Sequence, residues 1–199
     1  MKKITYLLLL SCFLSCQQEQ TENNSTKEET TDKAVASTVS EDELWLSLAP
    51  YMVPDARTPE EKEQNRIIDY ALEKGLLGSM TASGLFYHLS PGSDTAGISW
   101  GDRLQVFYKG QFLDGEVFDA AQNEEQPFEF YVGNMIDGWN EGLQLASPGS
   151  ELLLIIPSRL AYGKEGLKDK KDRYLIPPDE ILVFNILILE KVNQPDRNL

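Results

Sequence analysis

Cysteine and histidine are almost missing from this chain of 199 residues. The two cysteines, Cys12 and Cys16, both stand near the N-terminus, and His88 is the only histidine. The chain beyond Cys16 can therefore form no disulfide, and it lacks the set of thiolate and imidazole ligands that a zinc site requires. A Ser-His-Asp triad would have to use His88, which stands in an apolar segment where a structural histidine is more common than a catalytic one. We therefore expect neither a metal nor any other cofactor.

Positive charge is also scarce, since 18 Lys and Arg residues face 32 Asp and Glu residues and give a net charge of −14. A nucleic-acid-binding protein normally carries a basic patch, so this balance argues against nucleic acid as a partner. It also argues against electrostatic attachment to anionic lipid. The sequence contains neither GxxxxGK[ST] nor GxGxxG, so no phosphate-binding loop is indicated.

No apolar run reaches the roughly 20 residues that a membrane-spanning helix needs. A shorter apolar stretch, residues 4–14, follows Lys2 and Lys3 at the N-terminus. A short apolar stretch behind positive charge is typical of a secretory signal, which we assign to residues 1–15.

A cysteine that closes such a stretch resembles the lipobox of bacterial lipoproteins. Two cysteines fit, in Leu-Leu-Ser-Cys12 and in Phe-Leu-Ser-Cys16. Cys16 is favoured because the apolar stretch continues to Leu14 and polar sequence begins at Gln17, although Cys12 stays an alternative. The resemblance implies a lipid on Cys16, a membrane anchor, and a place in the bacterial cell envelope, in an outer membrane facing the periplasm or the cell surface.

The mature chain begins with a polar segment, residues 16–40, which is rich in Glu, Thr, Gln and Ser. Such a composition buries too little apolar surface to offset chain entropy, so we expect a disordered tether. Residues 41–82 are different and predict a helical extension. Its first part contains an apolar cluster, formed by Trp45, Leu46, Leu48, Tyr51 and Met52.

A helix in this extension has clear start and stop signals. Thr58 is a suitable N-cap, Pro59 fits the first helical position, and Glu61 completes a capping box. The sequence Lys74-Gly75 is typical of a helix end. This helix either packs on the rest of the protein, which we favour, or serves as a dimerisation or substrate-contact helix.

Strand patterns dominate after Gly84. An apolar run at residues 85–89, the alternation of Leu104, Val106 and Tyr108, and apolar runs at 150–156 and 181–191 predict strands. The run at 181–191 has so little polar alternation that we expect both of its faces to be covered. Helical spacing recurs at Ile136, Trp139 and Leu143, so the fold class is α+β, with several antiparallel strands and one short central helix.

The most specific motifs in this region combine aromatic or aliphatic residues with glycine and aspartate. In chain order they are Tyr108-Lys109-Gly110, Asp114-Gly115-Glu116-Val117-Phe118-Asp119, Pro127-Phe128-Glu129-Phe130, Ile136-Asp137-Gly138-Trp139-Asn140-Glu141-Gly142, Ala161-Tyr162-Gly163, Ile176-Pro177-Pro178 and Leu182-Val183-Phe184. The order resembles that of the FKBP family of peptidyl-prolyl cis–trans isomerases. The resemblance implies an FKBP-like antiparallel β-sheet wrapped around one short central helix over residues 83–193, followed by a tail at 194–199.

The resemblance also implies a set of site residues. Tyr108, Asp119, Trp139 and Tyr162 would be catalytic, with Trp139 under the proline ring and Tyr162 donating to a substrate carbonyl. The substrate-binding residues would be Phe118, Phe128, Met135, Ile136, Ile176 and Phe184. The segment 164–175 departs from the minimal family pattern because it is longer, is charged and lacks His-Pro-Gly.

The partners that the resemblance implies are proline-containing polypeptides and macrolide inhibitors. The function that follows is rotation about X–Pro bonds in exported proteins by a lipid-anchored isomerase. Two alternatives stay open at this point. One is a non-catalytic lipoprotein that binds proline peptides or acts as a chaperone, and the other is a structural component of the envelope.

Overall fold

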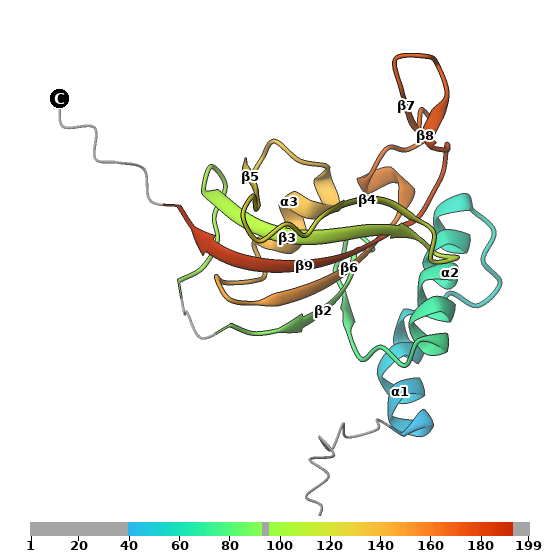
Figure 1. Ribbon diagram of the computed structural model, residues 1–199. Helices are drawn as coiled ribbons and strands as arrows, with labels where there is room; N and C mark the ends of the chain where they lie inside the picture. Colours follow the sequence, from blue (N-terminus) through green and yellow to red (C-terminus); the bar gives the residue numbers. More distant parts are fainter. Residues whose placement is uncertain (1–39, 93–95, 193–199) are drawn as a thin grey trace, which may run out of the picture. The chain divides into compact units, whose positions relative to one another are not determined.

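The computed structural model describes residues 40–92 and 96–192 (Figure 1), all within the compact unit Thr38–Leu199. The predicted signal peptide, both cysteines, the tether up to residue 39, residue 193 and the predicted tail at 194–199 lie outside the described residues. In the part that is described, no helix combines the length and the apolar character needed to cross a bilayer.

One antiparallel sheet of seven strands forms the centre of the molecule. Its order is β1-β2-β6-β9-β3-β4, and β5 pairs with the same strand β3 as β4 does. The bounds are β1 Ser79–Met80, β2 Phe86–Ser90, β3 Arg103–Phe112, β4 Val117–Ala121, β5 Phe128–Tyr131, β6 Glu151–Ile156 and β9 Leu182–Lys191. A sheet with one short helix confirms the predicted α+β class.

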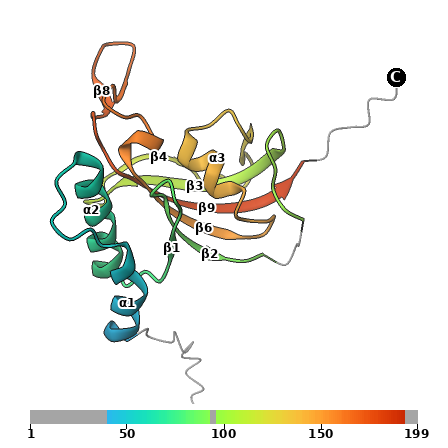
Figure 2. The same cartoon turned by 180° about the vertical axis from the view of Figure 1, so that it is seen from behind.

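The short helix α3 (Asp137–Leu143) lies against one face of the sheet (Figures 1 and 2). Gly138 and Gly142 allow this close approach, because a Cβ atom at either position would lie 2.4 Å from the side chain of Ile156 or 2.6 Å from that of Leu154. Alternate residues of β3 meet the helix from the sheet side, since successive side chains of a strand point to opposite faces. Leu104, Val106 and Tyr108 are accordingly buried, as their alternation predicted.

The predicted helix of the extension is α2 (Pro59–Glu73). Thr58 caps it, and Thr58 and Glu61 form the full capping box. Lys74 is the C-cap, and Gly75 follows with a φ of +66°, where a residue without Cβ carries no steric penalty. The apolar face of α2 packs on the opposite face of the sheet, which confirms the packing interpretation; the cluster contains Ile67, Ile68, Tyr70 and Ala71 of the helix with Phe86, Ile155, Ile181 and Val183.

The expected apolar cluster before this helix is only partly correct. Helix α1 (Glu41–Leu48) leads into the 3₁₀ turn η1 (Ala49–Tyr51), and its buried residues are Leu44 and Leu48. Trp45 and Leu46 were expected to belong to this apolar cluster, but they are 52% and 74% exposed. Residues four apart share one helix face, so Leu44 and Leu48 turn inward together while their neighbours face solvent.

Strand β9 is covered on both faces only near its start. Phe184 faces α3 and Val183 faces the α2 cluster, but Asn185 is exposed and Leu187 is half-buried. The prediction of two covered faces over residues 181–191 is therefore wrong for the second half. The physical reason is that α1 and α2 pack on one end of that face and leave the other end open.

The charged segment 164–175 contains a small antiparallel hairpin. Strands β7 (Leu167–Lys168) and β8 (Tyr174–Ile176) form it, and its tip extends beyond the main sheet (Figure 1). Leu167 pairs with the buried Ile176 at the base, while Tyr174 and Leu175 are exposed. The hairpin follows the 3₁₀ turn η2 (Ser158–Leu160).

Candidate active site

Trp139 of α3 lies at the centre of an aromatic cluster and is 1% exposed. Its ring meets those of Tyr108 and Phe184 edge to face, with centroids 5.1 Å and 5.2 Å apart. The ring of Phe130 is 5.5 Å away in a similar arrangement. Edge-to-face pairs of this kind stabilise a packed aromatic site beyond the area they bury. Among the described residues, the buried Nε1 of Trp139 has no hydrogen-bond partner.

Asn140, which the sequence analysis missed, fixes the loop before this helix. It is 4% exposed, its Nδ2 donates to the carbonyl of Met135 at 2.6 Å, and its Oδ1 accepts from the N–H of Gly133 at 2.8 Å. These bonds hold Met135 and Ile136 against α3. A signal was present in the sequence, because an asparagine directly beside Trp139 in a helical apolar pattern needs partners once it is buried.

Tyr108 and Asp119 come together because their strands pair. Gly110 of β3 lies opposite Asp119 of β4, and the Tyr108 hydroxyl donates to Asp119 Oδ2 at 2.6 Å. Burial, followed by this hydrogen bond to a carboxylate, raises the pKa of Tyr108 well above its usual range. Asp119 itself is exposed, so the pair places one carboxylate at the rim of the aromatic cluster.

Tyr162 follows η2 and is half-buried against the same core. Burial and then the negative charge of Asp119 raise the pKa of its hydroxyl. Unlike the hydroxyl of Tyr108, that of Tyr162 has no protein acceptor among the described residues. The backbone N–H of Ile136 likewise makes no hydrogen bond within the described part of the chain. Two donors therefore remain available beside the aromatic cluster.

The structure gathers all ten site residues predicted in the folded part of the chain. Phe118 lies 5.6 Å from Phe184, and Phe128 lies 5.4 Å from Tyr108, measured between ring centroids. Met135 and Ile136 pack half-buried against this core, and Ile176 is buried in it. Cys16 lies outside the described residues.

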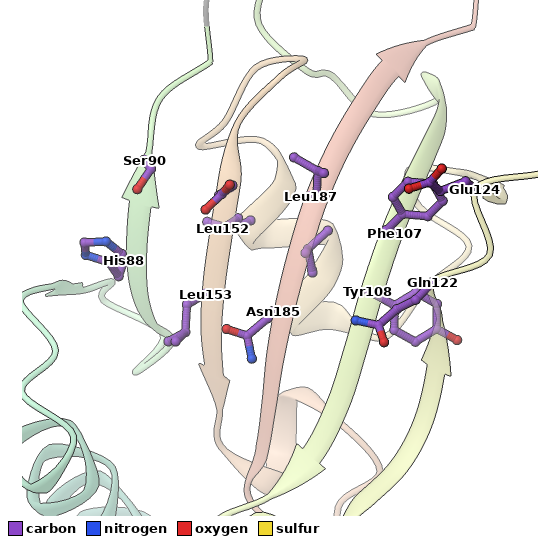
Figure 3. A pocket seen from close by; sticks show the side chains of 12 residues that line it. His88, Ser90, Phe107, Tyr108, Gln122, Glu124, Leu152, Leu153, Asn185 and Leu187 are labelled. Carbon is purple, nitrogen blue, oxygen red and sulfur yellow. The ribbon is translucent and has the colours of Figure 1, made fainter. Parts of the chain in front are cut away.

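A separate hollow of about 410 Å³ lies on the other face of the sheet (Figure 3). His88, Leu153 and Asn185 of β2, β6 and β9 line it, and the core residues Tyr108, Leu152 and Ile186 also border it. The Nδ1 atom of His88 hydrogen-bonds to the carbonyl of Leu77, which is the structural role expected for this residue. The donors and the Asp119 carboxylate thus belong to the α3 face, not to this hollow.

Comparisons with known proteins agree with this arrangement. Residues 95–189 match the family model described as FKBP-type peptidyl-prolyl cis-trans isomerase. A probable FKBP-type peptidyl-prolyl cis-trans isomerase of Haemophilus influenzae is 30% identical over 159 residues, which cover 80% of this chain and 64% of that protein. FK506-binding protein 2 of Yarrowia lipolytica is 35% identical over 117 residues, covering 58% of this chain and 78% of that protein.

The fold is also similar to that of a solved structure of this family. The crystal structure of FkpA from Escherichia coli superposes with a TM-score of 0.57 at 28% sequence identity, covering 78% of this chain and 65% of that one. The chain spans 64%, 49% and 48% of the length of the first three curated relatives it matches. These matches confirm the resemblance carried by the sequence motifs, and the chain belongs to the family of FKBP-type peptidyl-prolyl cis–trans isomerases.

Proposed function

We propose that this protein is an active isomerase that rotates X–Pro bonds in exported polypeptides. Residues 83–193 are its catalytic domain, residues 41–82 a helical extension, and residues 16–40 a tether to a lipid on Cys16. One observation carries the proposal. The Tyr162 hydroxyl and the Ile136 N–H, two donors without protein acceptors in the described chain, stand beside the buried ring of Trp139 and the Asp119 carboxylate.

The reaction requires no proton transfer and no covalent intermediate. Rotation of an X–Pro bond is slow because it breaks amide resonance, with a barrier of about 18–20 kcal/mol. A catalyst must bind the twisted amide more tightly than either planar form. The planar amide has the larger charge separation, so an apolar site disfavours it relative to the twisted one. An aromatic site with a few donors suits this chemistry.

Each residue then has a defined role. Trp139 forms the floor under the proline ring, and the other rings and aliphatic groups form its walls: Tyr108, Phe118, Phe128, Met135, Ile176 and Phe184. Tyr162 donates a hydrogen bond to one substrate carbonyl, and the Ile136 N–H holds another. Asp119, oriented by Tyr108, shapes the electrostatic field at the twisting bond.

The raised pKa values of Tyr108 and Tyr162 support the donor roles. An ordinary tyrosine ionises near pH 10. A raised pKa means that the protonated, donating form persists to a higher pH still. Both hydroxyls therefore remain donors throughout the physiological range, and neither acts as a general base.

The proposed location follows from the N-terminal segment, and the proposed partners follow from the location and from the aromatic site. A signal at residues 1–15 and a lipid on Cys16 place the protein in a bacterial cell envelope, where its substrates are exported proline-containing polypeptides. The matched family includes an FK506-binding relative, so macrolides are candidate inhibitors of the same aromatic site.

A protease-coupled assay on a proline-containing peptide tests the proposal, using a soluble chain of residues 38–199 that retains Ser40, the N-cap of α1. We expect faster cis–trans interconversion with no added metal or nucleotide, and inhibition by a macrolide or by excess proline peptide. Binding of the peptide without acceleration would instead support the alternative of a non-catalytic binding or chaperone lipoprotein.

A further inference from the structure

A carboxylate of the extension forms hydrogen bonds to a residue of the catalytic domain that is distant in sequence. Glu63 of α2 accepts the backbone N–H of Ser158 at Oε2, over 3.0 Å, and the Ser158 hydroxyl at Oε1, over 2.6 Å. Ser158 is 6% exposed and Glu63 is half-buried, so the contact is partly shielded from water. Hydrogen bonds to an ionised carboxylate are stronger than those between neutral groups, and two of them fix orientation as well as distance.

Ser158 in turn holds the backbone on both sides of Tyr162. Its carbonyl accepts the N–H of Ala161 at 2.9 Å and the N–H of Gly163 at 2.8 Å. The side chain of Tyr162 lies between these two anchors in the sequence, and within the described residues its hydroxyl has no acceptor of its own. The backbone and the packing of the ring against the core, not a bond at the hydroxyl, therefore decide where that hydroxyl stands.

We infer that Glu63 is a positioning residue, which acts through Ser158 to set the Tyr162 hydroxyl against the substrate. The inference rests on the proposed isomerase function and assigns part of it to the N-terminal extension. The turn that carries Tyr162 belongs to no strand of the main sheet, so ladder hydrogen bonds do not hold it. Glu63, which lies outside the catalytic domain, supports this turn through its bonds to the backbone N–H and the hydroxyl of Ser158.

Displacing a donor by a fraction of its hydrogen-bond length weakens the contact that the twisted amide needs. Other hydrogen bonds hold this segment as well, and they leave the Ser158 anchor to Glu63. The Gly166 N–H donates to the Tyr162 carbonyl at 3.1 Å, and the Asp179 N–H donates to the Gly163 carbonyl at 2.9 Å. Arg159, the next residue of η2, donates to the carbonyl of Ser83 and does not touch the Ser158 N–H. Removing Glu63 therefore loosens the Ser158 end of the Tyr162 segment, while the bonds from Arg159, Gly166 and Asp179 stay in place.

The test compares Glu63→Ala and Glu63→Gln with Glu60→Ala in the full chain. Glu60 is an exposed glutamate on the same helix that lines the same groove beside Ser158 and Gly163 and does not bond to Ser158. Each variant is made with and without Tyr162→Phe, and its unfolding curve is recorded. We expect Glu63→Ala to lower kcat/KM about three- to tenfold when Tyr162 is present, and less than about twofold in the Tyr162→Phe background.

The conservative variant gives a second readout. Glu63→Gln keeps a carbonyl oxygen that accepts from Ser158, so we expect it to recover most of the lost kcat/KM, whereas Glu60→Ala should match the wild type. Amide hydrogen exchange at Ala161 and Gly163 should be faster in Glu63→Ala and unchanged in Glu60→Ala, since exchange reports local opening.

Equal losses from Glu63→Ala in both backgrounds, or unchanged exchange at Ala161 and Gly163, would overturn the positioning role and leave Glu63 as a structural contact. Failure of the proposed function looks different, because the wild-type chain itself would then not accelerate isomerisation. The exchange measurement then still tests whether Glu63 holds the Tyr162 segment. If Glu63→Ala does not fold, Ser158→Ala, which removes the hydroxyl that donates to Glu63, takes its place in the same comparison.

Discussion

Removing one oxygen atom from Tyr162 separates substrate binding from folding. In Tyr162→Phe the half-buried ring stays, and no protein hydrogen bond in the described chain is lost. We therefore expect the free energy of unfolding to change by less than about 0.5 kcal/mol, as for most surface substitutions without a special contact. A hydrogen bond between neutral groups contributes a net of about 0.5–1.5 kcal/mol. If that bond forms more strongly to the twisted amide, kcat/KM falls by a factor of about 2 to 13.

The matched control is Tyr108→Phe, which removes the hydroxyl that donates to Asp119 at 2.6 Å. This variant loses a protein hydrogen bond, so we expect it to be less stable by about 1 kcal/mol. Protease-coupled kinetics and urea unfolding on the two variants give the comparison. The reasoning is refuted if Tyr162→Phe turns over peptide at the wild-type rate, or if a folded Tyr162→Phe protein has no turnover at all, since complete loss would indicate acid–base chemistry.

Four further predictions use the same assays. Asp119→Leu should lower kcat/KM about tenfold without abolishing turnover, and an unchanged rate would remove Asp119 from the site. Trp139→Ala should lower the free energy of unfolding by about 3–5 kcal/mol, measured with near-UV circular dichroism, and a folded variant with normal peptide binding would contradict the floor role. The rate should be nearly flat from about pH 6 to 9, because the pKa values of Tyr108 and Tyr162 are raised and their protonated forms persist above that range; a bell-shaped profile would disagree. Cys16→Ala should abolish incorporation of labelled fatty acid and leave kcat/KM unchanged, whereas continued labelling would identify Cys12 as the lipid site.

Local signals in the sequence were sufficient for α2. Thr58, Pro59 and Glu61 marked its start and Gly75 its end, because capping depends on side chains within one turn of the helix. The alternation of Leu104, Val106 and Tyr108 marked the buried face of β3 for the same reason, since the strand itself imposes the period. Motif order along the chain also identified the residues that now surround Trp139.

Contacts between distant segments could not be predicted in this way. Trp45 and Leu46 read as part of an apolar cluster, but which face of α1 turns inward depends on where α2 and the sheet lie. The second half of β9 is open because α1 and α2 cover only one end of that face of the sheet. The bonds from Glu63 to Ser158 join residues 95 positions apart, and no local pattern marks such a pair.

The sequence by itself determined the family, the α+β class, the start and end of α2 and the set of residues around the aromatic site, because each of these depends on neighbours in the chain or on motifs retained in order. Only the tertiary structure decided which donors are left without a protein acceptor among the described residues. It also decided that Asn140 holds the loop at Ile136, and that Glu63 of the extension bonds to Ser158 in the turn before Tyr162. These depend on hydrogen bonds between segments brought together by folding, and their geometry is set by the packing of α2 and α3 on opposite faces of one sheet.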